Sequence, residues 1–483
     1  MSYGYLELAR THAPLLVITA PMLGAALAVL GGRHWAWFAA AAAALASAWL
    51  ATDLAMRGSD AATAAFNIAL QVDGVGLATA ALLAAVSALA VIGFGAVSGE
   101  VERRVAPLGV ALMLCISGGW AGALMARDLI GLIVAVEIAW LAAVGLIALS
   151  ASRERGALNG ALRMLIGGGV GAAFMLLGAA MIGRAVGSLD LAAMPMAQLS
   201  MPRLAGAGAV LIILALALKA GVAPLHAWTG AALGRAGGAG LIGVGALAAV
   251  GALAVLARFT AYAITAPQIG AGVSAVLGVL GAASVVIGSA QAVGAQTLPR
   301  LTSYAAAAQA GCVLLSIALG SPAGFAAALV QLLALAAATL ALYGGAAAGR
   351  VQALSMLDGF AQRAPLASAA ITAGALSLMG APLTLGFLGR WALVEAGVGA
   401  GWWWAAALVI VASFAAVFYG GRLVERMYFR RGNDAFAGER SLWRLALAPA
   451  LSAALACIAM GAAPAALLRW AASAAAMLVG PPA

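Results

Sequence analysis

The chain has 483 residues, of which 65% are hydrophobic and 8% charged, and its mean hydropathy is +1.09. Because about a quarter of the residues in soluble domains are charged, this composition excludes a water-soluble globular protein and predicts an all-α, polytopic membrane protein. The net charge of +10 does not indicate nucleic-acid binding, since arginines gather in the loops of membrane proteins and fix their orientation.

Apolar runs between Arg, Asp, Pro and Gly residues predict about fourteen spans of the roughly 20 residues that a membrane requires. In chain order they lie near residues 14 to 31, 35 to 52, 73 to 97, 106 to 125, 129 to 150, 160 to 183, 205 to 229, 237 to 262, 268 to 290, 298 to 319, 322 to 348, 366 to 397, 402 to 421 and 446 to 470. We expect one transmembrane domain over residues 1–483, with the first span retained and not cleaved as a signal peptide.

The arginines predict which side of the membrane each loop faces. The loops after odd-numbered spans hold sixteen arginines, whereas the opposite side with the two termini holds seven, Arg258 among them. By the positive-inside rule, the odd-numbered loops face the cytoplasm and both termini face the outer, periplasmic side of a bacterial inner membrane.

Three spans carry an ionisable residue well inside an apolar run: Glu137, Lys219, which is the only lysine of the chain, and Arg390, which Glu395 follows five residues on. Because a charge at bilayer depth costs about 2.5 to 3.5 kcal/mol, each is a functional candidate. Structural alternatives stay open: Glu137 as a carboxylate bonded between helices, and Lys219 extending to the membrane interface.

Two of these spans also contain a helix breaker. Pro224 follows Lys219 by five residues, and a Gly-Ala-Pro sequence at 380–382 precedes Arg390. Proline removes a backbone hydrogen bond, so each helix is expected to be interrupted near a buried cation and to expose polar backbone to a cavity. Paired interrupted helices are typical of transporters built from inverted repeats.

These residues suggest a proton path. Burial disfavours the charged form of a lysine and a nearby carboxylate restores it, so Glu137 is the expected partner of Lys219. His226, two helical turns beyond Lys219, is a candidate for passing the proton onward, although a histidine bonded between helices or at the interface is the structural alternative. Arg390 does not deprotonate and would act as a fixed charge, with Glu395 titrating nearby.

The chain offers little for a cofactor, a metal or catalysis. Cys115, Cys312 and Cys457 lie far apart without a CxxC spacing, and the three histidines do not supply a paired set of ligands. We therefore expect no cofactor, metal or catalytic residue in this chain.

Five segments together resemble the antiporter-like membrane subunits of proton-pumping NADH:quinone oxidoreductase (complex I), Mrp-type antiporters and membrane-bound hydrogenases. They read RDLIGLIVAVE, ending at Glu137, FMLLGAAMIGRAVGSLDL, LALKAGVAPLHAW, LTSYAAAAQAGCVLL and SLMGAPLTLGFLGRW, and the resemblance covers about residues 73 to 430.

The resemblance implies fourteen helices and two inverted five-helix repeats, at 104–262 and 268–430, with the seventh and twelfth helices broken. Glu137 matches the family's fifth-helix glutamate, Lys219 its seventh-helix lysine, and Arg390 the twelfth-helix position. A basic residue at position 390 makes the N-type complex I subunit or the Mrp D-type the closer match.

The chain departs from the family at three places. The stretch 241–257 lacks the usual eighth-helix lysine or histidine, Arg390 replaces a titratable lysine, and the loop after Trp228 lacks the usual Pro-Asp. These departures weaken the expectation of continuous proton conduction along the membrane.

The sequence therefore predicts a proton-translocating, non-catalytic subunit of a multi-subunit oxidoreductase complex. Its expected partners are the lipid bilayer and other membrane subunits, with the redox centres and the quinone site on partner chains. Two alternatives stay open: a subunit of a redox-independent Mrp-type cation/proton antiporter, and a non-conducting scaffold.

Overall fold

The computed structural model describes residues 12–57, 63–65, 68–70, 73–97, 105–149, 155–432 and 444–479, and these are nearly all helical. A short antiparallel hairpin, β1 (Thr63–Ala65) and β2 (Ile68–Leu70), is the only sheet in these ranges. The all-α fold class is confirmed.

The helices are α2 (Ala13–Leu30), α3 (Gly32–Arg57), α4 (Gly74–Val97), α5 (Ala106–Met125), α6 (Leu129–Leu149), α7 (Arg155–Val186), η2 (Leu191–Ala193), α8 (Pro202–Lys219), α9 (Ala227–Ala232), η3 (Leu233–Arg235), α10 (Gly238–Gly240), η4 (Leu241–Ala248), α11 (Ala249–Ile264), α12 (Gly270–Gly294), α13 (Leu298–Ala318), α14 (Pro322–Ala348), η5 (Leu354–Leu357), α15 (Phe360–Arg363), α16 (Pro365–Met379), α17 (Leu385–Gly399), α18 (Trp403–Val424), η6 (Glu425–Phe429), α19 (Arg444–Ala462) and α20 (Ala465–Val479).

The long helices have the length and composition of membrane spans. Twelve in the described ranges qualify, or up to thirteen if the bent pair near the C-terminus counts as one span. The run at 366 to 397 is divided between α16 and α17, of 15 residues each, so the predicted number of fourteen stays a prediction. A helix suits lipid because it satisfies its backbone hydrogen bonds internally. Several helices here have proline at their first or second position, where its missing N–H needs no partner.

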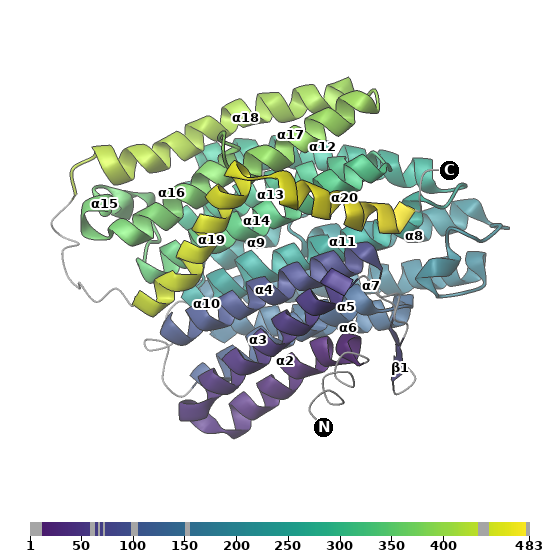
Figure 1. The fold of residues 1–483 in the computed structure, drawn as a ribbon, viewed down its shortest axis with the longest axis horizontal. Coiled ribbons are helices and arrows are strands. Elements are labelled where there is room, and N and C mark those ends of the chain that lie inside the picture. The colour runs from purple at the N-terminus through teal and green to yellow at the C-terminus, as the bar shows by residue number, and fades with distance from the viewer. Residues whose placement is uncertain are drawn as a thin grey trace.

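The helices pack against one another in a bundle in which the last helices, α19 and α20, return to contact α4 near the start of the chain (Figure 1). In this view α2 and α3 lie at one edge and α18 at the opposite edge. α14 contacts α4 as well as α13, α16, α17, α19 and η4, so it is a central helix that joins the N-terminal and C-terminal parts.

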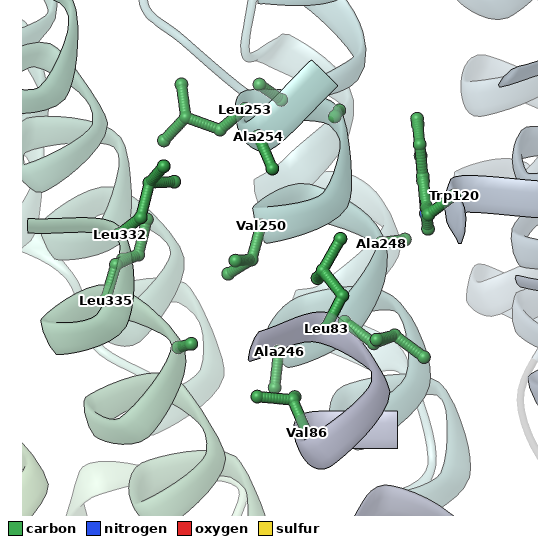
Figure 2. Close-up of a cluster of buried hydrophobic side chains, with 14 of the residues drawn as sticks. Leu83, Val86, Trp120, Ala246, Ala248, Val250, Leu253, Ala254, Leu332 and Leu335 are labelled. Carbon is green, nitrogen blue, oxygen red and sulfur yellow. The ribbon is translucent and has the colours of Figure 1, made fainter. Parts of the chain in front are cut away.

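The centre of the bundle is apolar around α11 and the π-helical segment η4. Figure 2 shows residues of η4 and α11 between Leu332 and Leu335 of α14 on one side and Trp120 of α5 on the other, with Leu83 and Val86 of α4 below. Within Gly238–Ile264, 94% of an 18-residue apolar stretch is buried, the largest share among the candidate membrane spans in the described ranges. The expectation of an apolar eighth helix before Arg258 is met, and this helix forms the core.

The expected span at 446 to 470 is not a single helix. α19 and α20 meet at a bend of 90°. Pro464 lies at the bend, where its ring and missing N–H prevent the helix from continuing. Just before the bend, a Cβ on Gly461 would lie only 2.4 Å from the backbone of Thr384, so glycine allows α19 to approach the second interrupted helix closely.

Candidate functional site

The first interrupted helix ends at Lys219. α8 stops there, and α9 begins at Ala227. Gly221 has a φ of +71°, a conformation that glycine adopts without strain, and Pro224 follows in the same break. The predicted interruption near Lys219 is therefore present.

Neighbouring helices hold the polar backbone of this break. The amide of Ala223 donates to Ser284 Oγ of α12 at 3.0 Å, and Ser284 in turn donates to the carbonyl of Ala307 at 2.7 Å. The indole Nε1 of Trp228 donates to the carbonyl of Leu218 at 2.7 Å. These bonds satisfy groups that a helix end leaves without partners, so the break is a built part of the fold.

Glu137 and Lys219 form an ion pair inside the bundle. Lys219 Nζ lies 2.9 Å from Glu137 Oε1, the lysine side chain is fully buried, and the glutamate side chain is 23% exposed. The structure thus brings together the two charges that were expected to be partners. A buried lysine is costly without a counter-charge, so Glu137 is what allows Lys219 to be charged at this depth.

His226 lies at the other end of the same break. It is 6% exposed, its Nε2 is hydrogen-bonded to the side-chain oxygen of Gln291, and its ring meets that of Tyr304 edge-on with centroids 5.8 Å apart. Its hydrogen-bond partner is thus an amide on α12. Because Gln291 is exposed, His226 lies between the interior of the bundle and its surface.

The second interrupted helix has Arg390 at its break. α16 ends at Met379 with Gly380 at a φ of +76°. Arg390 of α17 is 8% exposed and donates to the carbonyls of Leu378 and Met379 at 2.6 and 2.7 Å, and to Ser413 Oγ at 2.8 Å. The guanidinium therefore caps the last carbonyls of α16, where the helix dipole is negative.

Arg390 also begins a chain of amide side chains that no motif in the sequence indicates. Its Nε donates to Gln309 Oε1 at 3.4 Å, and the amide nitrogen of Gln309 donates to Gln331. Glu395 does not join this group, since it is exposed on α17. In the described part of the chain, Arg390 is thus surrounded by neutral acceptors, and the structure does not bring Glu395 to it.

A second buried ion pair lies apart from both breaks. Arg258 of α11 is fully buried, and its Nε lies 2.6 Å from Asp73 Oδ2, to which Tyr262 also donates at 2.8 Å. Its Nη1 donates to the carbonyls of Ala123 and Ala126 at the end of α5, at 3.3 and 2.7 Å. The cluster ties α11 and α5 to the residue that precedes α4.

The assignment of Arg258 to the loop arginines of the outer side is therefore wrong. It lies within α11 and is buried because Asp73 and two carbonyls take its hydrogen bonds. The signal in the sequence was an arginine flanked by apolar residues on both sides. Its acidic partner stands 185 residues earlier, where no helical spacing relates the two.

In the ranges that the structure describes, no three His, Cys, Asp or Glu side chains lie together in a way that could hold a metal ion. The arrangement instead offers buried charges at two helix breaks. Fold and site together define a multi-pass helical membrane protein with two interrupted helices, each with a buried cation.

The comparison with protein families gives this class a name. Residues 126–416 match the family NADH:quinone oxidoreductase/Mrp antiporter, TM, and the chain belongs to that family. The resemblance inferred from the sequence is confirmed.

Among curated proteins, the chain is 31% identical to NADH-quinone oxidoreductase subunit N of Desulforudis audaxviator over 328 residues, which are 66% of this chain and 64% of that protein. It is also 31% identical to the subunit N of Cereibacter sphaeroides, over 68% of this chain and 70% of that one. The matched part thus spans slightly less than two thirds of the Desulforudis protein.

Solved structures share the fold. A chain of the Mrp complex from Dietzia sp. superposes with a TM-score of 0.83 at 22% identity, covering 98% of both chains. A chain of respiratory complex I from Thermus thermophilus gives a TM-score of 0.78 at 24% identity, covering 95% of this chain and 98% of that one.

Proposed function

We propose that this chain is a proton-translocating, antiporter-like membrane subunit of a multi-subunit redox complex of the NADH:quinone oxidoreductase type. The observation that carries the proposal is the ion pair of Glu137 and Lys219, buried at an interrupted helix. The similarity to two curated subunit N proteins supports the type of complex.

The chemistry follows from the pair. While Glu137 is ionised, it favours the ammonium form of Lys219, which is fully buried. When Glu137 takes up a proton or moves away, the ammonium loses its counter-charge and gives its proton to an acceptor, leaving a neutral amine. Reprotonation of the amine from the other side of the membrane completes one transfer, and His226 is the candidate group between the break and the surface.

The remaining parts of the proposal concern architecture. We infer two inverted repeats, residues 104–262 and 268–430, because each contains one interrupted helix with a buried cation. The chain crosses a bacterial inner membrane with both termini on the periplasmic side, as the arginine distribution indicates. Other membrane subunits bind it, and partner chains hold the redox centres and the quinone site.

Proton transport in membrane vesicles tests the function. Inside-out vesicles from cells that make only the variant chain are supplied with NADH, and the uptake of protons per NADH oxidised is measured with a pH-sensitive dye. Glu137→Gln and Lys219→Ala are expected to lower this ratio with the complex still assembled. Arg127→Gln, which breaks an ion pair of 2.7 Å whose arginine is 47% exposed, is the matched control and should leave it unchanged.

The outcomes separate the alternatives. If Lys219→Ala leaves the number of protons taken up per NADH unchanged but weakens assembly of the complex, proton transport by this chain is refuted and the chain is a scaffold. Proton movement that follows an imposed sodium gradient but not NADH, in a complex that co-purifies without iron–sulfur subunits, identifies an Mrp-type antiporter.

A further inference from the structure

We propose that Trp140 is a positioning residue for Lys219, because the face of its indole forms a second acceptor for the lysine ammonium beside Glu137. Lys219 Nζ lies 4.6 Å from the centre of the Trp140 ring and 2.9 Å from the glutamate oxygen. This inference rests on the proposed function, in which the ammonium is the group that carries the proton.

The spacing on α6 creates this arrangement. Glu137 and Trp140 are three residues apart, so they project from neighbouring turns of the same helix face. Lys219 and Trp140 are both buried, at 0% and 1% exposed. A cation over an indole is attracted most strongly where water is excluded, so this contact belongs to the stronger kind.

The indole is fixed in the orientation that the contact requires. Its Nε1 donates to the carbonyl of Met164 on α7 at 3.2 Å. Its ring meets that of Trp228 edge-on, with centroids 5.1 Å apart and planes at 87°. A Cβ on Gly168 would lie 1.9 Å from Trp140 Nε1, so a glycine of α7 leaves the room that the ring occupies.

The two indoles hold the end of α8 at two points. Trp228 donates to the carbonyl of Leu218, the residue before the lysine, and Trp140 faces the ammonium of Lys219. Backbone and charge are therefore positioned by two aromatic rings in contact with each other.

The two acceptors of the ammonium differ in one respect. Glu137 changes its charge when it binds a proton, whereas the indole face does not titrate. When the carboxylate is neutralised, Trp140 still attracts the ammonium and keeps it at the same place in the break. We infer that the indole determines how readily Lys219 releases its proton in each cycle.

Fluorinated tryptophans test this contact with little change in shape. Tryptophan with one to four ring fluorines is introduced at position 140 by stop-codon suppression, and initial proton uptake is measured in the inside-out vesicles described above. Fluorine weakens the negative potential of the ring face, so the logarithm of the rate should change in equal steps with each fluorine. A rate that does not depend on the number of fluorines overturns the proposal.

Substitutions add a second measurement. Trp140→Leu is expected to change the rate by roughly ten- to thirtyfold, and Trp140→Phe, which keeps an aromatic face, by clearly less. The same fluorinated series at Trp120, a fully buried tryptophan of α5 packed on Gly251, is the matched control and should leave the rate unchanged.

Failure of this inference is distinguishable from failure of the proposed function. If Lys219→Ala abolishes proton uptake but the series at Trp140 is flat, the lysine carries protons and the indole only fills space. If Lys219→Ala leaves uptake unchanged, the proposed function itself is refuted.

Discussion

Replacing Asp73 with asparagine is expected to destabilise the protein by about 3 to 5 kcal/mol, the usual cost of removing one partner of a buried ion pair. Arg258 is fully buried and would keep its charge without the carboxylate that now lies 2.6 Å from its Nε. Asparagine has nearly the same shape and can still accept from Tyr262, but its amide nitrogen then replaces the oxygen that accepts from the Gly76 amide at 2.6 Å. The loss therefore reports the charge and this hydrogen bond, and not a cavity.

The measurement uses cysteines that the chain already contains. Cys312 and Cys457 are 3% and 0% exposed, so a thiol-reactive dye labels them only when the detergent-solubilised protein unfolds. Asp73→Asn should lower the unfolding midpoint by several degrees at a fixed scan rate. Asp358→Asn is the control, because Arg426 and Asp358 in its ion pair are 21% and 24% exposed and such a pair is worth about 1 kcal/mol or less.

A double variant completes the test. Arg258→Met alone leaves the buried carboxylate of Asp73 without its counter-charge and the carbonyls of Ala123 and Ala126 without this donor, so it should cost at least as much as Asp73→Asn. Combined with Asp73→Asn, it removes both charges, so the double variant should lose about 2 to 3 kcal/mol less than the sum of the two. Additive losses, or a midpoint for Asp73→Asn equal to that of the control, would refute the reasoning.

Three further predictions follow from the packing around the two breaks. Arg390→Leu should lower the unfolding midpoint more than Arg390→Lys, because leucine removes the guanidinium bonds to the last carbonyls of α16, leaving Leu378 only the longer bond from Tyr419, whereas lysine can still reach some of them; equal midpoints would contradict the capping role. Gly168→Ala should slow proton uptake, since the new Cβ would displace the indole of Trp140, while Gly169→Ala, which meets nothing within 4 Å, should act as wild type in the same assay. Gly461→Ala should lower the midpoint by several degrees, because its Cβ would lie 2.4 Å from backbone; a midpoint within one degree of wild type would show that the bend relaxes freely.

Much of this fold follows from composition, because lipid permits few solutions other than helices with internally satisfied backbones. The two interruptions were also predictable, since Pro224 and the Gly-Ala-Pro sequence at 380–382 mark them in the sequence. The pairing of Glu137 with Lys219 followed from the cost of burying either charge alone.

Which charged side chains lie beside one another depends on contacts between distant parts of the chain, and these could not be predicted from the sequence. Arg258 looks like a loop arginine until Asp73, far away in the sequence, is known to lie beside it. Glu395 stands close to Arg390 in the chain, but five residues along a helix do not bring two side chains to the same face. Trp140 was within reach of the sequence, because its spacing from Glu137 places both on one face.

The capped end of α16 has a consequence for how transport responds to acidity. The guanidinium of Arg390 keeps its proton at every pH that a cell meets, and its bonds to Leu378 and Met379 hold it at the second break. The second break therefore carries a constant buried charge, whereas in the proposed mechanism Lys219 at the first break gains and loses its proton. A pH profile of proton uptake should accordingly report the first interrupted helix, and the second contributes a steady electric field against which those changes occur.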